Sequence, residues 1–174
     1  KNVTISDLAT QSHKFETVVS RFITDLKTHS DNWRLFQAFI VGHLKRYRDN
    51  TEFKSLEEYN AYTRSVDLIA LSGQRVKSFA ELDIANFLFL KGVPFKYEPR
   101  YPHIKKAYRP DFYLPSIDTY IEHFGIDEQG KTAPFVVEEL YLKGMDWKRE
   151  THRKNGTILV ETYSWQKSRG TLLR

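Results

Sequence analysis

The chain contains no cysteine in its 174 residues. This absence excludes disulfides and metal sites built on thiolates, and it fits a reducing compartment. Long apolar runs are also absent. None approaches the roughly 20 residues of a membrane-spanning helix, and the first residues, KNVTISDLATQ, lack the pattern of a signal peptide. We therefore expect a cytoplasmic protein with no membrane contact, and the initial Lys suggests a piece of a longer protein.

Apolar residues make up 40% of the chain and aromatic residues 14%, which is enough for a hydrophobic core. The formal charge of +5 is unevenly distributed. Residues 91–109, KGVPFKYEPRYPHIKKAYR, hold six Lys or Arg against one Glu, with aromatic residues between them. This basic strip is suited to binding a phosphate backbone and stacking on bases, and the alternative is a solvated loop. The residues expected to contact nucleic acid there are Lys96, Arg100, Lys105, Lys106 and Arg109.

Hydrophobic periodicity divides the chain into two parts. Residues 1–74 have apolar residues at helical spacing, including a helix expected from Ser55 to about Leu71, and we interpret them as a helical segment. Residues 75–174 predict a helix from Ser78 through Leu90, strands between 94 and 124, a helix near 146–155 and a strand at 157–163. This order predicts a mixed α/β (α+β) domain in which a small sheet is flanked by helices.

The segment RPDFYLPSIDTYIEHFG, residues 109–125, reads as a β-hairpin because two aromatic and β-branched runs flank a turn-forming sequence. If Leu114 pairs with Thr119, Asp111 falls opposite Glu122 on one face. Two opposed carboxylates repel unless a cation or a shared proton lies between them. With Glu81 as a third acid, the pattern suits a Mg²⁺ or Mn²⁺ site. Glu81 also fits a capping role for the helix that begins after Ser78, and both readings stay open.

Residues 146–155, DWKRETHRKN, place several basic side chains on one predicted helix. Lys148 and His152 share one face, and Arg149 and Arg153 share another. A solvated helix is the simple interpretation. The functional one turns a face toward the acidic hairpin, where Lys148 stabilises charge on a phosphodiester and Arg149, His152 and Arg153 contact nucleic acid.

Residues 125–132, GIDEQGKT, fit the phosphate-binding expression G-x-x-x-x-G-K-[ST]. Asp127 and Glu128 lie where the anion would bind, and the preceding strand belongs to an antiparallel hairpin. The context therefore argues against a nucleotide site.

An acid on a helix, then RPD, then an acid on the next strand resembles the PD-(D/E)xK nuclease superfamily. The segments VKSFAELDIANFLFLKGVPFKYEPRY, YRPDFYLP, YIEHFGID, WKRETHRKNG and ILVETYSW are similar to the nuclease-like domain of some bacterial UvrD/Rep-type (helicase IV-like) DNA helicases, over about residues 55–174. The resemblance implies a restriction-endonuclease-like fold for residues 75–174, with helicase sequence before it.

The resemblance also implies roles for individual residues. Asp111 and Glu122 would be metal ligands, the backbone carbonyl of His123 would complete the set, and Glu81 would be the helix acid. The superfamily expects a lysine two residues after the second acid, where this chain has Phe124, so Lys148 is the candidate substitute.

Two functions follow from this reading. The first is Mg²⁺- or Mn²⁺-dependent hydrolysis of single-stranded or forked DNA beside a helicase motor, and the second is a catalytically silent module that binds or steers DNA strands. ATP would bind only to the motor, which is not in this sequence. The expected partners are DNA and the rest of the helicase chain.

Overall fold

The computed structural model describes residues 17, 19–29, 33, 36 and 47–174. Residues 19–28 are helical, as the sequence predicts. In the sequence, residues 15–26 and 33–47 have the helical apolar spacing of two further amphipathic helices, and their apolar positions 15, 18, 40 and 44 lie outside the described residues.

Two serines start helices as expected. The side chain of Ser55 accepts a hydrogen bond from the backbone of Glu58 at the start of α3 (Leu56–Val66), and Ser78 does the same for Glu81 at the start of α4 (Phe79–Leu90). A short 3-10 turn, η1 (Asn50–Glu52), precedes α3. The prediction that α3 runs to Leu71 is wrong, because Asp67 adopts a left-handed conformation with φ of 52° and ends the helix at Val66.

The sheet has four strands in the order β1 (Lys96–Tyr97), β2 (Phe112–Leu114), β3 (Thr119–Phe124) and β4 (Ile158–Tyr163). The first three are antiparallel neighbours, and β3 and β4 are parallel. The predicted hairpin register is confirmed, since Leu114 pairs with Thr119 and Phe112 with Ile121. The fold is therefore mixed α/β, as expected from the sequence.

The helix α5 (Glu138–Lys154) forms the crossover between β3 and β4, and α6 (Ser164–Ser168) follows β4. The helix α5 begins eight residues before the predicted start at 146, and its N-cap residue Val137 makes no side-chain capping bond. No local capping signal therefore marks its true start.

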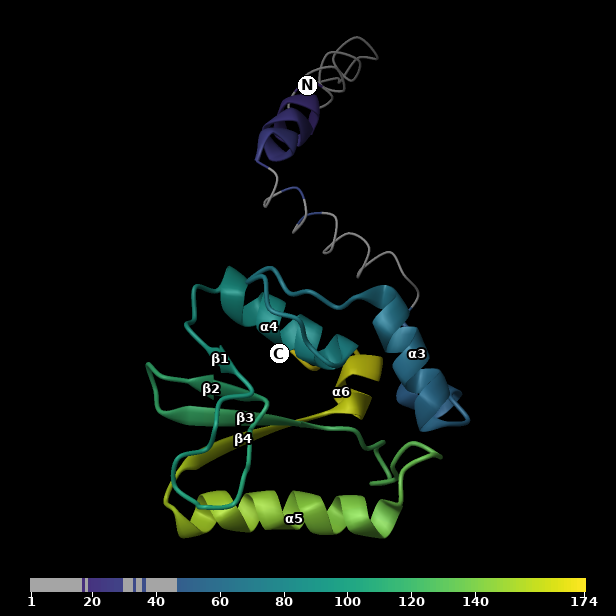
Figure 1. Ribbon diagram of the computed structural model, residues 1–174, viewed down its shortest axis with the longest axis vertical. Helices are drawn as coiled ribbons and strands as arrows, with labels where there is room; N and C mark the ends of the chain where they lie inside the picture. The colour runs from purple at the N-terminus through teal and green to yellow at the C-terminus, as the bar shows by residue number, and fades with distance from the viewer. Residues whose placement is uncertain (1–16, 18, 30–32, 34–35, 37–46) are drawn as a thin grey trace, which may run out of the picture.

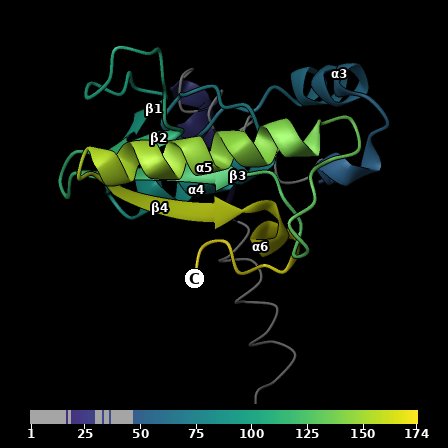
Figure 2. The ribbon, with the colours of Figure 1, turned by 90° about the horizontal axis from the view of Figure 1, so that it is seen from below.

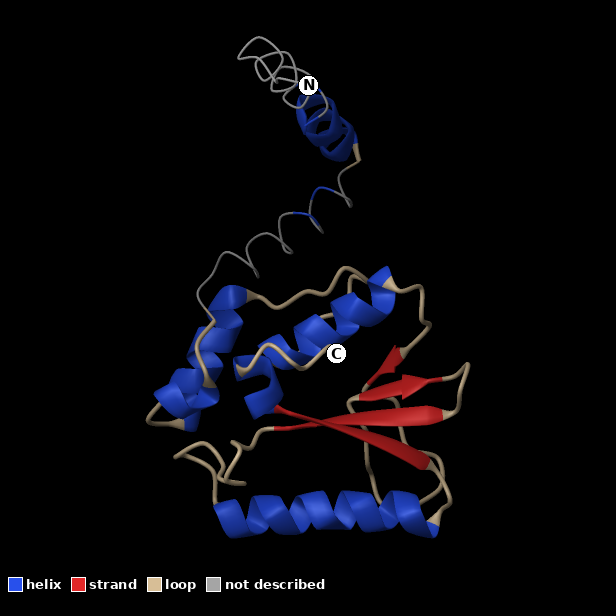
Figure 3. Cartoon of the chain, turned by 180° about the vertical axis from the view of Figure 1, so that it is seen from behind, coloured by secondary structure: helices blue, strands red, loops and turns tan. Residues whose placement is uncertain are grey.

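Helices cover both faces of the sheet (Figures 1 and 3). On the α4 face, Phe112 and Ile121 join Leu82 and Ala85 in the main hydrophobic cluster. On the α5 face, a second cluster contains Tyr101, Tyr108 and Tyr120 with Trp147 packed against it. Figure 2 shows α5 running across this face.

The expected domain boundary between residues 74 and 75 falls inside the main hydrophobic cluster. Val66, Leu68 and Ala70 before the boundary share this cluster with Leu82 after it. None of the helices in the described part of the chain is long and apolar enough to cross a membrane.

Candidate functional site

The acidic pair lies where the hairpin register predicts it. Glu122 is on β3 and is 0% exposed. Asp111 precedes β2, and its Oδ2 accepts a hydrogen bond of 2.7 Å from the backbone N–H of His123. This bond fixes Asp111 to β3, beside Glu122.

A lysine from α5 lies beside the acidic pair. Nζ of Lys148 forms an ion pair with Oε2 of Glu122 and lies 5.5 Å from the ring centroid of Phe124. The side chain of Lys148 is 30% exposed, so the ammonium connects a fully buried carboxylate with the protein surface. The expected proximity of Lys148 to the acidic pair is confirmed.

The other oxygen of Glu122 is held by a buried hydrogen-bond chain. The hydroxyl of Tyr108 donates to Oε1 of Glu122 at 2.7 Å, and Nε2 of His152 lies 3.0 Å from the same hydroxyl. Nδ1 of His152 lies 2.8 Å from Oγ1 of Thr157, which in turn lies 2.7 Å from the hydroxyl of Tyr101.

Counting the available hydrogens shows which group donates in each of these hydrogen bonds. Burial lowers the pKa of His152 to about 4, so its ring is neutral at pH 7 and carries one N–H. Because Tyr108 gives its only hydrogen to Glu122, Nε2 of His152 must be the donor to Tyr108 and Nδ1 the acceptor from Thr157. Every donor in this hydrogen-bond chain therefore points toward Glu122.

The prediction that His152 contacts nucleic acid is wrong. Its side chain is 1% exposed because it packs between Tyr101, Tyr108 and Tyr120 on the sheet side of α5. Its position one turn after Lys148 places both residues on the face that covers the hairpin, and this shared face was expected from their spacing.

Tyr108→Phe is expected to lower the free energy of unfolding by about 1–3 kcal/mol, because it removes a donor to buried Glu122 and leaves the N–H of His152 without an acceptor. Urea denaturation monitored by circular dichroism measures this change. The matched control is Tyr113→Phe, whose hydroxyl bonds to the exposed Asp118, and it is expected to change stability by less than about 0.5 kcal/mol. Equal effects of the two substitutions would contradict the role of the buried chain.

Glu81 is held at the start of α4 and is also close to the acidic pair. Its carboxylate accepts hydrogen bonds from the backbone N–H of Lys77 at 3.0 Å and from the hydroxyl of the N-cap residue Ser78 at 2.9 Å. It is also buried, and it accepts the hydroxyl hydrogen of Tyr97. Burial raises the pKa of Glu81, and the charge of Asp111 raises it further, which places Glu81 within electrostatic reach of the acidic pair.

The three acids outnumber the cations around them. Burial, followed by the charge of Glu122, raises the pKa of Asp111 to about 7. Lys148 balances one of the three carboxylates, while the nearby Lys77 pairs with Glu98. If all three acids are ionised, the remaining charge equals that of one divalent cation, and hard oxygen donors suit Mg²⁺ or Mn²⁺.

The acids do not form a complete metal cage. Within the described residues, no group of three or more His, Cys, Asp or Glu side chains is arranged to hold a metal ion. A Mg²⁺ ion needs one or two carboxylates and keeps several waters, so Asp111 and Glu122 with the carbonyl oxygen of His123 are sufficient donors. The expected role of Glu81 as a direct ligand has no support from this geometry.

The lysines and arginines of the basic strip are on the surface. All five side chains expected to contact nucleic acid there are exposed: Lys96, Arg100, Lys105, Lys106 and Arg109. Nζ of Lys106 lies 4.1 Å from the ring centroid of Trp147. The aromatic residues Tyr101 and Tyr108, however, are buried in the second cluster. The interpretation of these two rings as stacking platforms for bases is therefore wrong.

The arginines of α5 are paired with acids. Arg149 forms two hydrogen bonds with Glu161, at 2.8 and 2.7 Å, and Arg153 pairs with Glu150 at 2.7 Å. Their charges are therefore partly neutralised before any phosphate binds, although the Arg153 side chain is 73% exposed.

The segment 125–132 has no phosphate-binding geometry. Oδ1 of Asp127 accepts the backbone N–H groups of Gln129 at 2.9 Å and Lys131 at 2.8 Å. These N–H groups are the ones that a bound phosphate would require. The structure thus gives a physical reason for the absence of a nucleotide site here.

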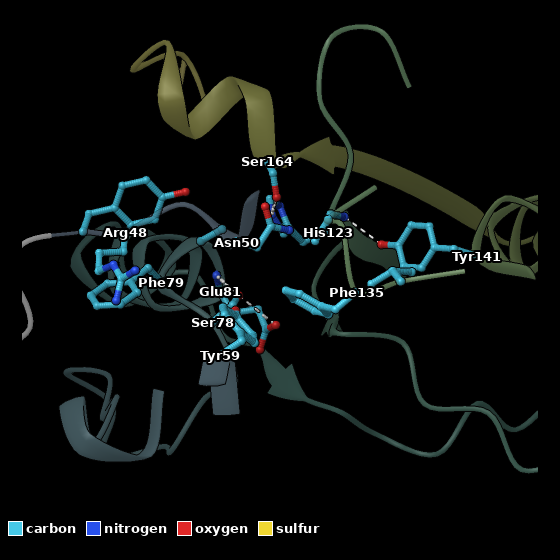
Figure 4. Close-up of a pocket in the computed structure, with 15 residues that line it drawn as sticks. Arg48, Asn50, Tyr59, Ser78, Phe79, Glu81, His123, Phe135, Tyr141 and Ser164 are labelled. Atoms are coloured by element: carbon cyan, nitrogen blue, oxygen red, sulfur yellow. Dashed lines mark hydrogen bonds between the residues drawn. The ribbon is translucent and has the colours of Figure 1, made fainter. Parts of the chain in front are cut away.

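A cavity beside the acids was not anticipated from the sequence. Figure 4 shows side chains that line it, among them Asn50, Glu81, His123, Phe135 and Tyr141. Burial lowers the pKa of His123 to about 4, and the ring lies 3.0 Å from Oγ1 of Thr162 and 3.3 Å from Oγ of Ser164. Comparison with known proteins supplies no family for this site, because no protein family, curated protein or solved structure matches the chain.

Proposed function

We propose that residues 75–174 form a nuclease-like domain of the PD-(D/E)xK type that hydrolyses phosphodiester bonds in DNA with Mg²⁺ or Mn²⁺. The observation that carries the proposal is the ion pair of Lys148 with Glu122 beside Asp111. It supplies the two carboxylates and the cation that such a reaction needs, although Phe124 occupies the usual lysine position.

The carboxylates of Asp111 and Glu122 would hold the metal ion, which supplies activation of water and neutralisation of phosphate charge when bound. Lys148 provides a positive charge at the surface end of the site, where an added negative charge on phosphorus would be stabilised. Tyr108 and His152 orient Glu122 from the buried side. Lys148 would thus stabilise negative charge that develops during the reaction, and Tyr108 would position the carboxylate of Glu122.

The mixed sheet with helices on both faces supports a restriction-endonuclease-like arrangement, in which the acids come from α4, β3 and the residue before β2. We further propose that the domain is an accessory part of a UvrD/Rep-type DNA helicase. In that protein the motor would bind ATP, and single-stranded or forked DNA would reach the domain from the motor.

A second candidate function is a catalytically silent DNA-binding module. Phe124 at the usual lysine position and the hydrogen bonds that hold Glu81 at the start of α4 favour it. In this version the exposed basic strip binds the phosphate backbone and the acids have no catalytic role.

Nicking of a fluorescent forked DNA by the purified chain tests the proposal. We expect slow cleavage with Mn²⁺ or Mg²⁺ and none with EDTA, because the acids need a divalent ion to act on a phosphodiester. Denaturing gel electrophoresis measures the products. Binding without cleavage in either metal would favour the silent module, and in that case Lys105→Glu with Lys106→Glu should weaken binding and reduce its salt dependence.

A further inference from the structure

The cavity beside the acids has a volume of about 230 Å³ and is built from segments that are far apart in the chain. Its lining residues come from η1 and the residues just before it, α3, the start of α4, β3 and the segment after it, the first turns of α5 and the start of α6 (Figure 4). The volume is below the roughly 300–1,000 Å³ of sites for drug-sized ligands. It therefore suits one small group.

The walls of the cavity combine aromatic rings with a few hydrogen-bonding groups. The rings of Tyr59 and Phe135 stack at 5.8 Å, and both line the cavity. The amide side chain of Asn50 lines the cavity and offers both a donor and an acceptor there. Tyr141 accepts the N–H of Gly125 at 2.7 Å and keeps its own hydrogen for donation. Such walls are typical of sites for neutral heterocycles.

The charges around the cavity disfavour a phosphate inside it. The carboxylate of Glu81 lines one side. Arg48 is the one lysine or arginine among the described lining residues, and it is engaged with Glu52 at 3.4 Å and with the ring of Phe53 at 4.2 Å. A nucleotide would therefore enter with its base and leave its phosphate outside.

The cavity and the acidic pair are neighbours. His123 lines the cavity, and its backbone N–H is bonded to Asp111. A phosphodiester held at Asp111 and Lys148 would thus bring an adjacent base to the opening. A base reaches such a cavity only if it is unpaired and unstacked.

We propose that this cavity binds one unstacked base of a single DNA strand next to the phosphodiester held at the acidic pair. The proposal rests on the proposed function and specifies its substrate as single-stranded DNA or an unpaired end.

An abasic scan of short single-stranded oligonucleotides tests the proposal with Ca²⁺ in place of Mg²⁺, because Ca²⁺ also binds carboxylate oxygens and lets the acidic pair hold a phosphodiester. We expect removal of the base at one position to weaken binding about tenfold, the scale of one base stacked on aromatic side chains, and removal elsewhere to have little effect. Fluorescence anisotropy measures the affinity. A scan with equal effects at every position would overturn the inference.

Substitutions of residues that line the cavity test whether the sensitive base of the oligonucleotide binds there. Phe135→Ala should weaken binding of the intact strand about tenfold and abolish the effect of the abasic position. Phe89→Ala, at a 49% exposed position on α4 outside the cavity, is the matched control and should leave the scan unchanged. Gly125→Ala tests the same cavity by narrowing it. The added Cβ would lie 3.3 Å from Nδ2 of Asn50 and 3.5 Å from the hydroxyl oxygen of Tyr141. An unchanged scan in Phe135→Ala and Gly125→Ala would exclude this cavity as the base site.

The outcomes separate the cavity from the proposed function. Cleavage with a scan of equal effects would overturn the base site and leave the nuclease proposal standing. A single sensitive position without cleavage in any metal would support the base site within a silent binding module. No binding of single-stranded DNA would overturn both.

Discussion

Asp111→Asn is expected to reduce DNA cleavage by about a thousandfold or more, because the metal loses a carboxylate ligand and with it several kcal/mol of charge stabilisation. The backbone bond from His123 persists, since an amide oxygen accepts it equally well. Single-turnover cleavage with Mn²⁺ measures the effect. Asp118→Asn, on the exposed hairpin turn, is the matched control and should retain activity. Full activity of Asp111→Asn would remove this residue from the reaction.

The same substitution is expected to stabilise the metal-free protein at high pH. Burial and Glu122 raise the pKa of Asp111 to about 7 from its usual 3.8, so the folded chain retains a proton that the unfolded chain releases. The free energy of unfolding therefore falls as pH rises between these two values, and an asparagine avoids this loss. We expect Asp111→Asn to be about 1–2 kcal/mol more stable than the wild type at pH 8, with a smaller gain at pH 5.

Urea denaturation in EDTA at the two pH values measures this difference. Addition of Mg²⁺ at pH 8 should stabilise the wild type more than Asp111→Asn, because only the wild type has both carboxylate ligands. A variant that is less stable than the wild type at pH 8 would show that the charge on Asp111 is well compensated without metal.

Lys148→Met is expected to destabilise the protein by about 3 kcal/mol at pH 8, because it leaves the 0% exposed Glu122 without its cation. Adding Glu122→Gln to this variant should recover most of the loss, since a neutral amide needs no counter-ion and still accepts the hydrogen bond from Tyr108. Both values come from urea denaturation without metal.

The control for this prediction lies on the same helix. Lys143 forms an ion pair with Glu139 in which both side chains are exposed, so Lys143→Met should change stability by less than about 0.5 kcal/mol. If Lys148→Met has an equally small effect, water rather than Lys148 compensates the charge of Glu122.

Local sequence patterns predicted the parts of the site that are made locally. The hairpin register followed from two strand-like runs around a turn, and it placed Asp111 opposite Glu122. The spacing of Lys148 and His152 placed them on one helix face. Which way that face turns is a tertiary property, and the hypothesis that it turns toward the hairpin agrees with the ion pair of Lys148.

The rest of the site depends on contacts that no local pattern encodes. Tyr108 was interpreted as a stacking residue because it is surrounded by lysine and arginine, yet it turns inward to Glu122. The cavity brings Asn50 and Ser164 together from opposite ends of the described chain. The start of α5 was missed because Val137 provides no side-chain cap.

The crossover through α5 also determines when the site is assembled during folding. The hairpin residues that carry the acids are close in sequence, whereas Lys148 follows Glu122 by 26 residues and Thr157 follows Tyr101 by 56. Contacts of long sequence separation form late because loop closure costs entropy. On the ribosome, the acids therefore emerge well before the cation and the hydroxyl that complete their surroundings. A nascent or partly unfolded chain would thus expose the carboxylates without Lys148, and the assembled site would belong only to the fully folded domain.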